Sequence, residues 1–386
     1  MLKFTFLKSP KLSWVSANPK KIGLIIFVTV ILISLLIVDQ LMNYIQPPEK
    51  SDNSYIVREI HLREHHPRLE TTYNFKGRDY LFRIDANGFI LPHNTHENPD
   101  YEIVFLGGST TESMYVTENN RFPYLTGQLI EENNHNLINT YNAAVAGNNS
   151  IHSLDILLNK IIPMNPDIVV FMHAINDYTT LAYEHTYWPI GTSRSLIVTI
   201  KGSIEKETFY WHFKGLFRSV YPNIYQKLFD IKHKLIYRSE SAKKQDEWAG
   251  RRHQINNRNF ESMKQDFEWA LNMLIYTSKT KGILPVLMTQ ANIFQIIPDD
   301  KISKTSAFLV NAGLKISTFS KEYNIFNDII RKVASDNEIP LIDLENIVPQ
   351  DSTYFYDQVH FNDKGSRLVA SIISEHLINI INTSEK

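Results

Sequence analysis

The stretch YEIVFLGGSTTE, residues 101–112, places a serine directly after a run of apolar residues. Residues 103–106 have the length and composition of a buried parallel strand, which Gly107-Gly108 ends in a sharp turn. Ser109 would then lie in the first turn of a helix, where unpaired backbone N–H groups and the helix dipole favour negative charge. A serine there can be a nucleophile. The same residues also fit a capping box, in which Ser109 only bonds the amide of Glu112.

A second segment, YDQVHFNDKG near the carboxyl end, pairs an aspartate with a histidine. Asp357 precedes His360 by three residues, so the carboxylate can bond one imidazole nitrogen and leave the other for Ser109. Nucleophilic acyl transfer needs such a base and a group that orients it. The spacing alone also fits an ordinary turn.

Two further motifs supply donors for an oxyanion. NAAVAGNNS contains Gly147, whose backbone N–H is unhindered, and FMHAIND contains Asn176, whose side-chain amide can donate. Gly147 could instead be a turn glycine with positive φ, and Asn176 a helix cap. The motifs of Ser109, Gly147 and Asn176 each follow a predicted strand, and the motif of His360 precedes the last predicted helix. We therefore expect all four at the carboxyl edge of one sheet.

The elements that would position these residues alternate between strands and helices. We predict strands at residues 103–106, 137–143, 168–172, 284–288 and 341–342, and helices at 121–132, 150–161, 257–280, 325–334 and 362–381. Such alternation predicts an α/β fold with a parallel sheet covered on both faces. Ligands of these sheets bind outside the carboxyl ends of the strands. Before them, residues 80–91 predict a hairpin that turns at Asp85 to Gly88.

The four motifs in this order resemble those of the SGNH hydrolases, also called the GDSL lipases and esterases. FRIDANGF before GGST, and the stretch from NRNFESMKQ to ILPVLMTQ, are also similar to segments of extracytoplasmic members. The resemblance covers roughly residues 80–377 apart from an insertion. One departure is Gly108, which stands where the family's name has aspartate. The second is the insertion, which separates Ser109 from His360 by more residues than in minimal members.

The resemblance implies a three-layer α/β/α flavodoxin-like fold and a serine esterase. Ser109 would be the nucleophile, His360 the base and Asp357 the residue that orients it. The backbone N–H groups of Ser109 and Gly147 and the side chain of Asn176 would form the oxyanion hole. No cofactor or metal is required. The expected substrate is an ester, with acetylated carbohydrate as the leading candidate; acyl transfer to a polysaccharide, lipase activity and a non-catalytic envelope binding role are the alternatives.

The amino-terminal region contains an uncharged run at residues 22–38 that is apolar on every side. As a helix it would span about 25 Å, the short end for a membrane span, and residues 41–45 can lengthen it. Five lysines and no acidic residue precede it, so the positive-inside rule places the amino terminus in the cytoplasm. A cleaved signal peptide is the competing interpretation, but no small-residue cleavage site follows. We therefore predict a single-pass anchor with the catalytic domain outside the cytoplasm.

Composition and charge set the remaining expectations. The 386 residues are 43% hydrophobic and carry a formal net charge of -1, and this charge gives no reason to expect nucleic acid as a partner. The absence of cysteine excludes disulfides.

Residues 201–260 hold 13 basic and 6 acidic residues. They also show an amphipathic aromatic pattern that Pro222 should divide into two helices. We expect these aromatics to pack on the domain as a lid; contact with anionic lipid or an acidic polymer is the alternative. The predicted layout is a tail at 1–21, the anchor at 22–42, a stalk at 43–76 and the catalytic domain at 77–386, with an insertion at about 185–256.

Overall fold

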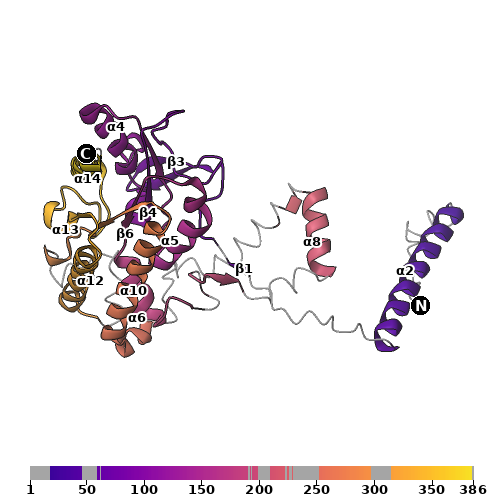
Figure 1. The fold of residues 1–386 in the computed structure, drawn as a ribbon. Helices are drawn as coiled ribbons and strands as arrows, with labels where there is room; N and C mark the ends of the chain where they lie inside the picture. Colours follow the sequence, from indigo (N-terminus) through magenta and orange to yellow (C-terminus); the bar gives the residue numbers. More distant parts are fainter. Residues whose placement is uncertain are drawn as a thin grey trace, which may run out of the picture. The chain divides into compact units, whose positions relative to one another are not determined.

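The fold was analysed in a computed structural model, shown in Figure 1. It describes residues 18–45, 59–60, 62–189, 192, 194–198, 209–221, 224–225, 228, 252–296 and 314–384. The chain divides into two compact units, Met1–Val57 and Arg58–Lys386.

The second unit is built on a five-stranded sheet in which every neighbouring pair is parallel. Its strands in chain order are β4 Tyr101–Gly107, β5 Ile138–Asn142, β6 Ile168–Met172, β8 Leu284–Met288 and β9 Leu341–Ile342. The spatial order is β5-β4-β6-β8-β9, which is the flavodoxin-like order, since the chain leaves β4 in one direction and returns to its other side at β6. The predicted α/β fold with a parallel sheet is confirmed, and the strand bounds differ from prediction by two residues at most.

Helices cover both faces of this sheet (Figure 1). One face packs against α4 Phe122–Asn134 and α14 Asp363–Ser384, and the other against α5 Ser150–Ile156, α6 Ile175–Glu184, α10 Phe260–Lys279 and α12 Ile316–Asp336. Alternate residues of β4 divide between the two cores: Ile103 and Phe105 belong to the first, Val104 and Leu106 to the second. Residues 103–106 of β4 and all of β6 are buried, which explains why these two segments are continuous apolar runs.

Of the predicted helices, α12 differs most, because it begins at Ile316 and not near residue 325. No side chain caps its start, so the sequence carries no start signal there. Its buried residues Phe319, Tyr323 and Phe326 follow helical spacing onto the core. Shorter segments complete the domain: α3 Ser109–Glu112, α13 Leu344–Ile347, the 3-10 turns η1 Glu118–Asn120, η3 Ile162–Met164, η4 Arg252–Asn257 and η5 Phe294–Ile296, and the π-helical turn η2 Leu157–Ile161.

The hairpin before the sheet lies earlier than predicted. β2 Glu70–Phe75 pairs with β3 Arg78–Arg83 across a turn in which Lys76 and Gly77 both have positive φ, as the tight turns of hairpins require. The predicted pairing of residues 80–91 is reduced to a single bridge between Ile84 and Ile90. The turn at Asp85 does form, since its carboxylate accepts the backbone N–H groups of Asn87 and Phe89, each at 2.8 Å.

Part of the segment predicted to be a stalk belongs to the domain. The compact unit starts at Arg58, and β1 Glu59–Ile60 pairs in antiparallel fashion with β7 Ile197–Val198 from the insertion. Leu62 packs against the main core, and the Lys160 ammonium donates to the Glu64 carboxylate at 2.8 Å. The predicted domain start at residue 77 is therefore too late, because polar residues of this segment are held by specific partners that its composition does not reveal.

The first unit contains one described helix, α2 Pro19–Ile45. Its large apolar side chains between Leu24 and Leu41 for which burial is described are exposed by 42 to 63%. By criteria of length and apolar content, no helix among the residues described qualifies as a membrane span.

The insertion contributes helix α8 Phe209–Val220, which ends just before Tyr221-Pro222 as predicted. Most of the predicted second helix lies outside the described residues. Phe213 and Leu216 of α8 are exposed by 57% and 63%.

Candidate active site

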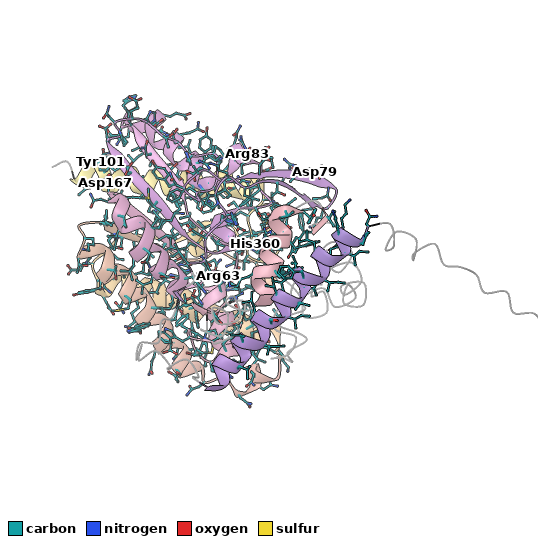
Figure 2. The ribbon with its side chains drawn as sticks, turned by 90° about the vertical axis from the view of Figure 1, so that its right-hand side faces the viewer. Arg63, Asp79, Arg83, Tyr101, Asp167 and His360 are labelled. Carbon is teal, nitrogen blue, oxygen red and sulfur yellow. The ribbon has the colours of Figure 1, made fainter. Side chains whose placement is uncertain are left out.

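Ser109 stands where β4 turns into α3, at the carboxyl edge of the sheet. The helix cap is Gly108, and no side chain caps α3, so the capping-box interpretation of Ser109 is wrong. β4 and β6 flank the point where the strand order reverses, which is where open α/β sheets bind ligands. Ser109 and Asn176 follow these two strands directly. In Figure 2, Tyr101 marks the opposite, amino end of β4, away from His360.

Ser109, His360 and Asp357 form a continuous hydrogen-bonded relay. The Ser109 Oγ lies 2.7 Å from His360 Nε2. On the other side of the ring, Nδ1 lies 2.8 Å from Asp357 Oδ2 and 2.9 Å from Oδ1. An ionised carboxylate only accepts, so Nδ1 carries the proton and Nε2 is left to accept the Ser109 hydroxyl. This is the tautomer in which the imidazole can take the serine proton.

The Asp357 carboxylate is held in its ionised form. Burial acts to raise its pKa, but the neighbouring His360 and the backbone N–H groups of Val359 and His360 outweigh that effect and bring the pKa below its usual range. Those N–H groups donate to Oδ1 at 3.0 and 2.9 Å. The His360 side chain is 21% exposed, so the relay opens to solvent at the serine end.

The expected oxyanion donors lie beside the nucleophile. Within the described chain, the backbone N–H groups of Ser109 and Gly147 donate no hydrogen bond. Gly147 has a φ of 81°, so it is also the turn glycine that the alternative interpretation proposed. Asn176 is the second residue of α6 and does not cap it. Its Nδ2 donates to Asn148 O at 2.9 Å, which leaves a second N–H of the same amide for a ligand.

Both glycines before Ser109 are required by close contacts. A Cβ on Gly107 would lie 2.4 Å from Thr111 Oγ1 and 2.8 Å from the backbone oxygen of Met172. A Cβ on Gly108 would lie 2.2 Å from Asn176 Nδ2. The departure from aspartate at position 108 thus has a physical consequence in this chain, because only glycine leaves room for Asn176 in its observed place.

Aromatic side chains that the sequence patterns did not single out form a wall beside the histidine. The Tyr356 ring stacks on His360 with an interplanar angle of 5° and a centroid distance of 5.3 Å. Phe75, the last residue of β2, contacts Tyr356 and Tyr115, with ring centroids 5.1 and 4.6 Å away. Burial and the nearby Asp357 charge raise the pKa of Tyr356, which keeps its hydroxyl neutral. No local pattern links residues 75, 115 and 356, so only the fold could reveal this wall.

A second array of serine, histidine and aspartate lies deeper in the domain. His173 Nε2 is 2.9 Å from Ser153 Oγ, and His173 Nδ1 is 3.7 Å from Asp177 Oδ2. All three residues are exposed by 3% or less. Asp177 also accepts the Ser150 N–H and the Tyr187 hydroxyl at 2.9 and 2.7 Å. No substrate carbonyl can reach this array in the folded chain, so it joins α5, β6 and α6 structurally.

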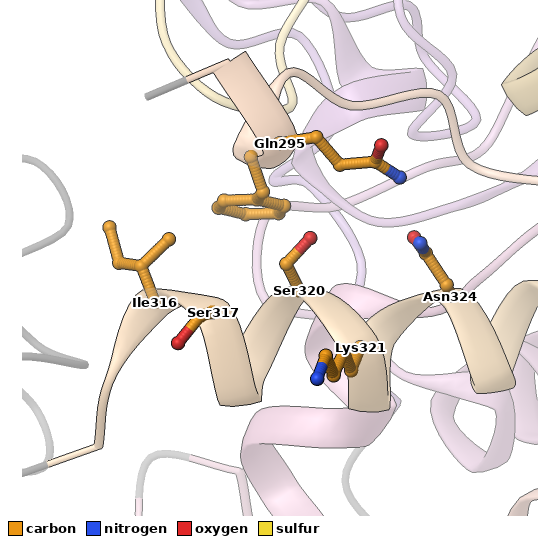
Figure 3. Close-up of a pocket in the computed structure, with 7 residues that line it drawn as sticks. Gln295, Ile316, Ser317, Ser320, Lys321 and Asn324 are labelled. Atoms are coloured by element: carbon orange, nitrogen blue, oxygen red, sulfur yellow. The ribbon is translucent and has the colours of Figure 1, made fainter. Parts of the chain in front are cut away.

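A pocket of about 490 Å³ lies between η5 and the start of α12. In Figure 3, Ser320 and Asn324 point from α12 toward Gln295. The pocket contains none of the relay residues, although Ile293 next to it donates its backbone N–H to Gln358 O at 2.9 Å. The relay at the sheet edge therefore lies outside this pocket.

Comparison with known proteins finds no matching family model and no matching curated protein. The chain is similar in structure to a GDSL-like lipase from Parabacteroides merdae, with 13% identity, 73% of this chain and 97% of that chain covered, and a TM-score of 0.41. A lipase/acylhydrolase from Enterococcus faecalis is 14% identical, with 72% of this chain and 96% of that chain covered and a TM-score of 0.41. The acetyl xylan esterase AlAXEase is 17% identical, with 71% of this chain and 98% of that chain covered and a TM-score of 0.37. Similarity at this level leaves the chemistry of the chain to be argued from its own site.

Proposed function

We propose that this protein hydrolyses carboxylic esters through an acyl-enzyme formed on Ser109. One observation carries the proposal: the relay from Asp357 through His360 ends on Ser109, next to a backbone N–H and a side-chain amide that are available to an oxyanion. A nucleophile, a base, a group that orients the base and oxyanion donors are the parts that acyl transfer needs.

In the proposed cycle, the Ser109 oxygen attacks the ester carbonyl while His360 Nε2 takes the hydroxyl proton. The tetrahedral oxyanion is held by the N–H groups of Ser109 and Gly147 and by Asn176. His360 then returns the proton to the leaving alcohol, which departs and leaves the acyl group on Ser109. Water, deprotonated by His360, then attacks the acyl-enzyme, and His360 returns that proton to the Ser109 oxygen as the acid is released.

The finer proposal is that the substrate is an O-acylated carbohydrate, with acetyl as the acyl group. The half-buried aromatic wall of Phe75, Tyr115 and Tyr356 supports it, since such rings offer a flat apolar surface for a sugar ring beside the base. A panel of acetylated oligosaccharides, phospholipids and longer-chain esters tests this choice. Release of acetate mainly from the sugars is the expected result, whereas preference for phospholipid would replace it with a lipase function.

We also propose that the chain is held at a membrane by residues 22–42, with the catalytic domain outside the cytoplasm. The support is a helix whose apolar side chains are exposed along its length, preceded by a lysine-rich tail. The test is to wash membranes carrying the full chain with alkaline carbonate, beside a variant that starts after residue 45. Recovery of the full chain in the wash would reject the anchor.

The central test exposes the full-length, detergent-solubilised chain to a fluorophosphonate probe and a short-chain nitrophenyl ester. Ser109→Ala is the matched variant, because it removes one oxygen. We expect labelling and hydrolysis in the parent chain and neither in the variant. A folded parent chain that neither labels nor cleaves would instead favour a non-catalytic binding role.

A further inference from the structure

The loop that contains Gly147 accepts two hydrogen bonds from an arginine outside the predicted motifs. Arg63 lies just after β1, and its Nη2 donates to Ala146 O at 3.2 Å while Nη1 donates to Gly147 O at 3.4 Å. Asn148 returns a bond, since its Nδ2 donates to Arg63 O at 3.2 Å. Figure 2 labels Arg63 near His360 in that view. These hydrogen bonds join Arg63 to Gly147, 84 residues later in the sequence, at the proposed oxyanion hole.

The contact with Ala146 O bears on the chemistry because of how a peptide unit is built. The Ala146 carbonyl and the Gly147 N–H belong to the same planar amide. A cation that bonds the carbonyl draws electron density through that amide and makes its N–H a stronger donor. The Gly147 N–H is the group expected to face the oxyanion.

The preceding peptide, between Val145 and Ala146, is held as well. The N–H of Ala146 donates to Glu112 Oε1 at 3.0 Å, and Glu112 is only 1% exposed. Glu112 in turn faces the imidazole of His65, whose Nε2 is 3.0 Å from the same oxygen. Arg63 thus bonds the carbonyl of Ala146, and His65 contacts the carboxylate that accepts the Ala146 N–H. Rotation of the 146–147 peptide would break the bond between Arg63 and Ala146 O. The bond to Glu112 holds the neighbouring 145–146 peptide.

We infer that Arg63 is a positioning residue for catalysis, which orients and polarises the Ala146–Gly147 peptide so that the Gly147 N–H stabilises the oxyanion. The inference rests on the proposed esterase function and deepens it. It makes the segment at residues 62–65 part of the competent site.

The test compares Arg63→Gln, Arg63→Lys and Arg63→Ala in the full-length chain. Arg68→Gln is the control, because it removes an exposed positive charge five residues further along the chain. For Arg63→Gln we expect kcat to fall about 10- to 100-fold, the effect of losing a charge-assisted hydrogen bond, with KM changed by less than about twofold. Affinity for a boronic acid that mimics the tetrahedral intermediate should fall in parallel with kcat/KM. Arg63→Lys should retain more of the activity than Arg63→Gln, and added guanidinium should restore part of it to Arg63→Ala.

Each outcome decides the inference. Unchanged kcat in Arg63→Gln, with an active parent chain, would overturn the role of Arg63 and leave the esterase proposal standing. A loss that also raises KM, spares boronate affinity and resists guanidinium would show a structural role only and overturn it as well. A folded parent chain with no hydrolysis and no boronate binding would remove both proposals together.

Discussion

The domain contains the same three residue types in two arrays with different surroundings. Ser109, His360 and Asp357 lie at the carboxyl edge of the sheet, with the histidine 21% exposed and its base nitrogen 2.7 Å from the serine. Ser153, His173 and Asp177 lie inside, where the aspartate is 3.7 Å from the histidine. The first array has unbonded backbone donors beside it, and the second is enclosed by other side chains. Residue type is therefore not sufficient for catalysis; access and oxyanion donors separate the two arrays.

The largest difference should come from the two serines. Ser109→Ala is expected to reduce kcat about 10⁶-fold, since the nucleophile of a relay carries nearly the whole effect of the triad. Ser153→Ala should leave kcat within about threefold and lower the free energy of unfolding by about 1 kcal/mol through one lost buried hydrogen bond. Nitrophenyl ester kinetics and denaturant unfolding measure both. Comparable losses of kcat in the two variants would contradict the assignment of different roles to Ser109 and Ser153.

The two aspartates should differ next. Asp357→Asn removes the acceptor that fixes the His360 tautomer, and we expect kcat to fall about 10⁴-fold with little change in stability. Asp177→Asn should instead lower stability by about 1–3 kcal/mol, because it weakens the bonds to the Ser150 N–H and the Tyr187 hydroxyl. If Asp177→Asn were the more damaging to turnover in folded protein, the assignment of the arrays would be reversed.

A smaller effect tests the donors that only the outer array possesses. Asn176→Ala should lower kcat about 10²- to 10³-fold through the loss of one oxyanion donor. Gly108→Ala should produce a loss in the same direction, because its Cβ would displace the Asn176 amide from 2.2 Å away. In the double variant the two losses should not add, since both remove the same donor. Full activity in Gly108→Ala would show that Asn176 is not held as a donor.

The smallest expected effect is on how the free energy of unfolding depends on pH. Burial lowers the pKa of His173, and burial with the charges of Arg63 and Arg194 lowers that of His152 to about 3. The unfolded chain takes up protons on these histidines below pH about 6.5, while the folded chain does not. The free energy of unfolding should therefore fall as the pH falls below that value, by about 1.4 kcal/mol per pH unit for each histidine. His173→Gln and His152→Gln should each flatten the slope measured by urea unfolding between pH 7 and 5; an unchanged slope in both would contradict their buried neutral state.

Much of the fold follows from local sequence because buried strands and their helices have strong periodic patterns. The five strands could be predicted to within two residues for that reason. The start of α12 could not, because no cap marks it, and the hairpin was misplaced because the turn at Lys76-Gly77 carries less sequence signal than Asp85 to Gly88. In the site, the proximity of Ser109, His360 and Asp357 was predictable from their places after strands and before a helix.

The sequence by itself determined the sheet, the edge at which its strands end, and the four motifs at that edge, because each depends on the chain within a few residues. Only the tertiary structure decided that Arg63 reaches Ala146 and Gly147, and that Phe75 contacts the Tyr356 ring that stacks on His360. It also decided that Gly108 must lack a side chain beside Asn176. These contacts join residues tens or hundreds of positions apart. Their formation depends on how separate segments pack together, which no local pattern encodes.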